Sequence, residues 1–113
     1  PLLDFALSYK PWVQQIQNVM SQQGTRDTRS VCLLSHGLDA SQMSAFHYHG
    51  GFDVKPVDKT QAEQQRTCTW LVVDNDLRPE LAQVIRLNEW RRVRSIYRPA
   101  DKKENVTLYQ RRS

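Results

Sequence analysis

Two short apolar runs, each with a cysteine at or next to its first residue, constrain the fold of this chain more than any other feature. They are Val31–Ser35 and Thr69–Val73, with Cys32 inside the first run and Cys68 directly before the second. Both runs are continuous rather than alternating, and polar residues bound them. This pattern is typical of strands that are buried on both faces of a parallel sheet.

Helical spacing of apolar residues appears between and around these runs. Trp12–Met20 has the pattern of an amphipathic helix, and Pro11 suits the first turn of that helix. Asp39 is placed to cap a second helix, Ala40–His49, which ends at a pair of glycines. A third, short helix is expected over residues 79–88, because a proline begins that segment.

The remaining strands have weaker signals. Phe52–Val57 alternates and contains a proline, which favours an edge position. The polar stretch 58–67 is expected to form a surface loop or a short exposed helix. Trp90–Tyr97 and Asn105–Arg111 alternate around the turn residues 98–103, and together they predict an antiparallel hairpin with a longer loop.

This order of elements predicts an α/β fold. Parallel strands joined by right-handed helical crossovers give a small three-layer α/β/α sandwich with a mostly parallel central sheet, finished by the C-terminal antiparallel hairpin. The 113 residues fit a single domain, and 39% hydrophobic and 25% charged residues are ordinary globular values. No segment approaches the roughly 20 apolar residues of a membrane span. Because the chain opens at Pro1 without an initiator Met, we expect residues 1–113 to be one soluble domain from a longer protein.

Positive charge is concentrated at the C-terminal end. The net charge is +4, and the segment 86–113 holds nine Lys or Arg residues against three acidic ones. A basic face of this kind attracts anionic lipid, nucleic acid or phosphate-bearing substrates, although it is equally typical of a solvated strand face. The candidate residues for contact with an anionic surface are Arg91, Arg92, Arg94, Arg98, Lys102 and Lys103.

The sequence offers no catalytic, cofactor-binding or metal-binding constellation. His47 and His49 are two positions apart, which puts them on different faces of a helix and makes them a poor ligand pair. The Ser35-His36-Gly37 turn lacks the flanking glycines of a nucleophile elbow. We therefore assign no catalytic residue, no metal ligand and no cofactor.

The two cysteines suggest a disulfide. If the strands at Cys32 and Cys68 are parallel neighbours, both sulfur atoms lie at the same end of the sheet. Their Cα atoms can then fall within the roughly 4.4–6.8 Å that a disulfide requires. The alternative is a pair of reduced, buried thiols in a cytosolic protein.

Several motifs in the C-terminal half resemble a known family. They are Thr67–Val73, Trp90-Arg91-Arg92-Val93, the turn Tyr97–Glu104 and the closing Leu108-Tyr109-Gln110-Arg111-Arg112. The Arg-Pro-x-Asp-Lys-Lys-Glu turn and the final strand are the most specific parts, and the front half of the chain matches loosely. This pattern resembles the C-terminal soluble domain of bacterial membrane glycosyltransferases similar to the lipid A aminoarabinose transferase and the protein mannosyltransferases.

The resemblance implies a function for the parent protein. Such a protein moves a sugar from an undecaprenyl-phosphate carrier to a lipid A or protein acceptor, and its catalytic carboxylate lies in membrane loops outside this sequence. The domain would be non-catalytic and would face the periplasm at the bacterial inner membrane. Its partners would be the transmembrane portion of the same chain and anionic lipid head groups. The alternative is a stand-alone basic α/β module for nucleic acid or a nucleotide, but no recognised nucleic-acid motif is present, so we do not expect nucleic acid as a partner.

Overall fold

The computed structural model describes residues 2–98 and 101–112, and the side chains of residues 9–97 and 105–112. Its regular elements, with 3₁₀-helices labelled η, are α1 (Leu2–Gln22), β1 (Cys32–His36), α2 (Ala40–Gly50), β2 (Asp53–Pro56), η1 (Lys59–Gln61), α3 (Ala62–Gln65), β3 (Trp70–Asp74), η2 (Asn75–Gln83), η3 (Leu87–Glu89), β4 (Trp90–Arg98) and β5 (Asp101–Arg111). None of the helices in the described part of the chain is long and apolar enough to cross a membrane.

The strands form one five-stranded sheet in the order β2-β1-β3-β5-β4, which confirms an α/β fold with a C-terminal antiparallel hairpin. The strand β1 pairs in parallel with both β2 and β3. The strand β5, however, pairs antiparallel with both β3 and β4, which makes the sheet mixed. The expected mostly parallel sheet is therefore not confirmed, because the hairpin joins the centre of the sheet through β5 and supplies its two longest strands.

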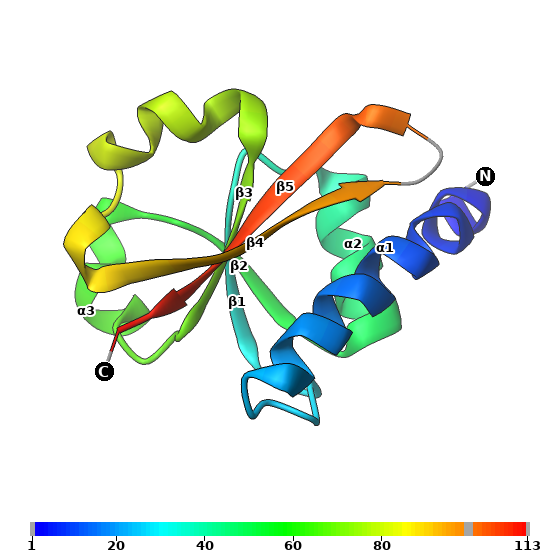
Figure 1. Ribbon diagram of the computed structural model, residues 1–113, viewed down its shortest axis with the longest axis horizontal. Coiled ribbons are helices and arrows are strands. Elements are labelled where there is room, and N and C mark those ends of the chain that lie inside the picture. The colour runs from blue at the N-terminus through cyan, green and yellow to red at the C-terminus, as the bar shows by residue number, and fades with distance from the viewer. Residues whose placement is uncertain (1, 99–100, 113) are drawn as a thin grey trace.

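The two faces of the sheet are covered differently (Figure 1). The helices α1 and α2 pack against each other and against one face, around a core that includes Trp12, Phe46 and Trp70. The opposite face carries a smaller apolar cluster that includes Leu71, covered by the 3₁₀ segments that follow β3. The predicted three-layer α/β/α sandwich is not confirmed, because short 3₁₀ turns stand where a second layer of helices was expected.

The helix α1 is longer than its amphipathic pattern predicts, and Pro11 lies inside it rather than in its first turn. Proline removes one backbone hydrogen bond from a helix and crowds the preceding turn. Directly after Pro11, the side chains of Trp12, Val13 and Ile16 are fully buried. Burial of that apolar face offsets the cost, because tertiary packing supplies most of a helix's stability in a folded protein.

The ends of α2 follow the prediction. Asp39 caps the helix through its side chain, which accepts a hydrogen bond from Gln42 N at 2.8 Å. The Asp39 N–H in turn donates to Gln42 Oε1 at 2.9 Å, which completes a capping box. Gly51 follows the helix in the left-handed conformation, with a φ of 69°.

The predicted helix over residues 79–88 is wrong. The chain instead forms η2 from Asn75 and η3 from Leu87, with Pro79 inside η2. Pro79 therefore does not start a helix, because the helical segment begins four residues earlier, at Asn75. The buried Leu81 and the half-buried Val84 are three positions apart, a spacing that 3₁₀ geometry brings onto one side.

The hairpin is tighter than predicted. Arg98 pairs with Asp101, so the strands extend into the segment expected to be a loop, and residues 99–100 lie outside the described residues. Along β5, Val106 and Leu108 belong to the cluster under α1 and α2, whereas Tyr109 belongs to the opposite cluster. The predicted alternation of faces is therefore confirmed for β5. In β4 a bulge between Arg92 and Arg94 interrupts it, so Trp90 and Ile96 lie in opposite clusters.

Candidate functional site

The cysteines lie where the two central strands begin. Cys32 starts β1 and Cys68 precedes β3 by two residues, and the parallel register places Leu33 opposite Trp70. The two cysteines form a disulfide, with Cα atoms 5.1 Å apart. The Cys68 side of this link is buried, so the bond fastens β1 to the segment that leads into β3.

Four of the predicted surface cations lie on β4, the outer strand of the hairpin, and the side chains of Arg91, Arg92 and Arg94 are exposed. Arg91 Nη2 donates to Gln23 Oε1 at 2.9 Å and to Gln110 Oε1 at 2.8 Å. Arg92 Nη2 donates to a serine hydroxyl on the same strand, at 2.7 Å. The side chains of the other three predicted residues, Arg98, Lys102 and Lys103, lie outside the described residues.

These cations are divided between the two faces of the strand. Arg92 pairs with Tyr109, which belongs to the cluster under the 3₁₀ segments. Arg94 pairs with Leu108, which belongs to the cluster under α1 and α2, and it borders a groove of about 340 Å³ between α1 and β4. Paired residues on neighbouring strands project from the same face. The described arginines therefore present charge along an edge of the sheet rather than on one flat face.

The histidines show no shared chemistry. His36 ends β1, and its buried Nε2 has no hydrogen-bond partner. His47 Nδ1 lies 2.9 Å from the carbonyl oxygen of Phe52, and the His49 ring packs edge-on against Tyr48. Within residues 9–97 and 105–112, no group of three His, Cys, Asp or Glu side chains is arranged to hold a metal ion.

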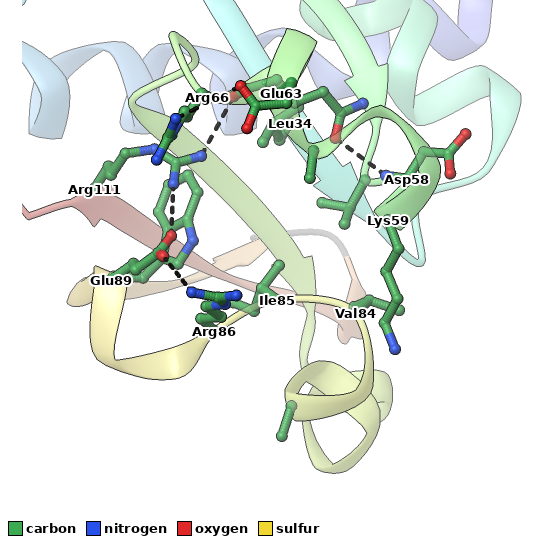
Figure 2. A pocket seen from close by; sticks show the side chains of 15 residues that line it. Leu34, Asp58, Lys59, Glu63, Arg66, Val84, Ile85, Arg86, Glu89 and Arg111 are labelled. Carbon is green, nitrogen blue, oxygen red and sulfur yellow. Dashed lines mark hydrogen bonds and ion pairs between the residues drawn. The ribbon is translucent and has the colours of Figure 1, made fainter.

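The structure adds a site that sequence reasoning missed, a cleft of about 470 Å³ on the face opposite α1 and α2 (Figure 2). One wall is η1–α3, and the other is η2–η3. We call it the charged cleft. Its lining residues are Leu34, Val57, Asp58, Lys59, Ala62, Glu63, Gln65, Arg66, Ala82, Val84, Ile85, Arg86, Glu89, Trp90 and Arg111.

The guanidinium of Arg111 is the best-anchored cation in the charged cleft. Its Nε donates to the carbonyl of Cys68 at 2.9 Å, and its Nη2 donates to the carbonyl of Gln65 at 3.3 Å. Its Nη1 donates to Glu89 Oε2 at 3.1 Å. The Cζ atom of Arg111 lies 4.2 Å from the centre of the Trp90 ring, in a cation–π contact. The side chain is 19% exposed, so these contacts fix its orientation.

Charges of both signs surround Arg111. Burial lowers the pKa of its guanidinium; Glu89 opposes this effect, and the nearby positive charge of Arg66 adds to it. Glu89 also lies 4.0 Å from Arg86, so a single carboxylate faces two arginines. The lining holds four cations and three carboxylates, which leaves a net charge of 4 − 3 = +1.

The wall formed by η1 and α3 is held in place by Gln65, which is 6% exposed. Its Nε2 donates to the carbonyl of Pro56 at 3.0 Å, and its Oε1 accepts from Asp58 N at 3.1 Å. These bonds connect α3 to the end of β2. The disulfide at Cys68 restrains the same segment three residues later. The wall is therefore pre-formed, as ligand pockets usually are.

The charged cleft has the chemistry of a binding site. Among the side chains that the structure describes, those that line the cleft include no Ser, Thr, Cys or His. The cleft offers instead an apolar floor and several guanidinium groups, which can hold an anion in two-point contact. No signal in the local sequence marks this site, because its residues come from separate segments of the chain.

No protein-family model, curated protein or solved structure gives a significant match to this chain.

Proposed function

We propose that this chain is the non-catalytic periplasmic domain of an integral-membrane glycosyltransferase that moves a sugar from a polyprenyl-phosphate carrier to a lipid A or protein acceptor. The observation that carries the proposal is the disulfide between Cys32 and Cys68, which links β1 to the segment that leads into β3. Such bonds persist in oxidising compartments, of which the bacterial periplasm is one. The resemblance of the hairpin motifs to that enzyme family supports the identity of the parent protein.

The outer strand supports a role at the membrane surface. Arg91, Arg92 and Arg94 are exposed along the edge strand β4. If this edge of the sheet faces the membrane, the arginines on both faces of β4 lie near lipid head groups. Each basic residue close to an anionic surface contributes about 1 kcal/mol of binding free energy. We include Arg98, Lys102 and Lys103 in the same contact, since they continue the hairpin.

Vesicle flotation tests this surface. The protein should float with vesicles that contain phosphatidylglycerol. It should remain in the bottom fraction when the vesicles contain phosphatidylcholine alone. Arg92→Gln combined with Arg94→Gln should weaken binding about thirtyfold, the equivalent of about 2 kcal/mol. The control pair, Arg26→Gln with Arg78→Gln, removes the same charge from exposed positions elsewhere and should bind like the wild type. Equal flotation with neutral vesicles would contradict the proposal.

The gene itself offers an independent test. The reading frame upstream of Pro1 should encode several hydrophobic spans, because the proposed partner is a transmembrane portion of the same chain. A frame that encodes none would rule out a membrane enzyme as the parent. In that case a gel-shift assay at physiological salt would examine the alternative, a basic module for nucleic acid, whose affinity should fall steeply as salt rises.

A further inference from the structure

We propose that the charged cleft binds a phosphate monoester that carries a short hydrocarbon chain or another apolar group. This proposal rests on the cleft alone and does not require the proposed function. It assigns a ligand class to a site that lies away from α1 and α2, on the opposite face of the sheet.

The apolar half of the ligand is indicated by the floor and one wall of the cleft. Val57, Val84 and Ile85 are half-buried and border the opening, while Leu34 and Trp90 close the floor and are 2% and 5% exposed. Val57, Val84 and Ile85 keep part of their surface exposed, because only the short segments η1, α3, η2 and η3 border the cleft on this face of the sheet. Contact with a hydrocarbon group would remove their remaining surface from water, which favours binding in proportion to the apolar area covered.

The anionic half is indicated by cations that come from three directions. Lys59 lies on the wall formed by η1, Arg86 lies on the opposite wall, and Arg111 reaches the cleft from β5 (Figure 2). Lys59 forms no ion pair with any described side chain, and Arg86 has only the 4.0 Å contact with a carboxylate. Lys59 and Arg86 line the same cleft from opposite walls, and a phosphate presents several oxygen atoms that accept hydrogen bonds from such cations, a geometry that arginine matches well.

The carboxylates of the cleft do not cancel this preference. Asp58 Oδ1 already accepts hydrogen bonds from the backbone N and the hydroxyl of Thr60, at 2.9 and 2.7 Å. Glu63 is 3.5 Å from Arg66 on the same wall, and Glu89 lies between two arginines. A cationic ligand would have to compete with these partners, whereas an anion meets guanidinium groups that retain free N–H donors.

Titration with small soluble ligands, followed by ¹⁵N–¹H NMR of the full chain, tests the proposal. Hexyl phosphate should shift the amide signals of residues 57–66 and 82–90. Butyl phosphate should bind about fifteenfold more weakly if the two missing methylenes are buried, since each one contributes about fourfold. Inorganic phosphate and hexanol should bind weakly or not at all, because each lacks half of the recognised group.

Paired variants separate this site from general attraction of anions. Lys59→Gln with Arg86→Gln should weaken the binding of hexyl phosphate at least tenfold, whereas Arg26→Gln with Arg78→Gln should leave it unchanged. All four side chains are exposed, so both variants should keep the wild-type melting temperature. Equal affinity for hexyl phosphate and inorganic phosphate, or equal loss in both variants, would overturn the proposal. Signal shifts confined to β4 would also overturn it, and they would leave the membrane-surface contact standing.

Discussion

Removal of the disulfide should lower the free energy of unfolding by about 4 kcal/mol. Cys32 and Cys68 are separated by 36 residues, so the bond closes a long loop in the unfolded chain. The chain-entropy relation gives a loss of roughly 13 cal/mol/K for a loop of that length, which is about 4 kcal/mol at 25 °C. A domain of this size has an unfolding entropy of about 0.24 kcal/mol/K, so its melting temperature should fall by about 17 °C.

Urea unfolding followed by tryptophan fluorescence measures this effect, because Trp12, Trp70 and Trp90 are all at least 95% buried. The double substitution Cys32→Ala with Cys68→Ala should shift the midpoint by about 2 M urea, given a slope of about 2 kcal/mol/M. Wild-type protein in a reductant should shift by a similar amount. The double variant should not respond to the reductant, which makes it the matched control.

Two results would refute this reasoning. Thiol titration of the denatured, unreduced wild type should find no free thiol, and two free thiols would show that Cys32 and Cys68 are not bonded. If the bond is present but its removal costs less than about 1 kcal/mol, the loop-closure argument fails. The unfolded chain would then already hold these two segments together, because residual structure reduces the entropy that a cross-link removes.

Three further changes should be measurable. Arg111→Met should lower the free energy of unfolding by about 2–4 kcal/mol in urea, because it leaves two carbonyls and a carboxylate without their donor, whereas exposed Arg112→Gln should have little effect. Thr28→Val should cost about 1–3 kcal/mol in the same assay, because the buried hydroxyl donates to a carbonyl at the end of α2, at 2.6 Å. The pKa of Asp27 is lowered to about 2, chiefly by the side-chain hydrogen bond from Arg29. Because the folded pKa lies below the unfolded value, this pair stabilises the fold above about pH 4 and is lost as the pH falls toward 2. An NMR titration of the Asp27 carboxyl should show that low midpoint, and Arg29→Gln should return it toward 3.8.

The strands were the most predictable part of the fold. The two continuous apolar runs correspond to β1 and β3, and the alternation in the hairpin assigned Leu108 and Tyr109 to opposite faces. These patterns are local, since burial on one or two faces leaves a period in the sequence. Helix caps are local as well, which explains why Asp39 was recognised as the start of α2.

The arrangement of the strands was less predictable, because it depends on pairing between distant segments. The alternation of apolar and polar residues identified β4 and β5 as a hairpin. It contained no information on which other strand would pair with β5. Its pairing with β3, with Val72 opposite Leu108, turned an expected mostly parallel sheet into a mixed one. Local signals also failed at Pro11 and Pro79, where proline usually marks the start of a helix. Burial of the apolar face of α1 offset the cost of proline in the first case, and in the second the helical segment began four residues earlier, at Asn75, as a 3₁₀-helix.

The charged cleft shows why a binding site can escape sequence analysis even when its surroundings are predicted well. Its walls come from the polar stretch 58–67 and from the segment where an α-helix was wrongly expected. In place of a regular helix over residues 79–88 the chain forms η2 and η3, and Val84 and Ile85 lie between these two segments. Both side chains remain half-buried and line the cleft beside Arg86. The same local departure that made the secondary structure hard to predict therefore opens the cleft and gives it a charged rim.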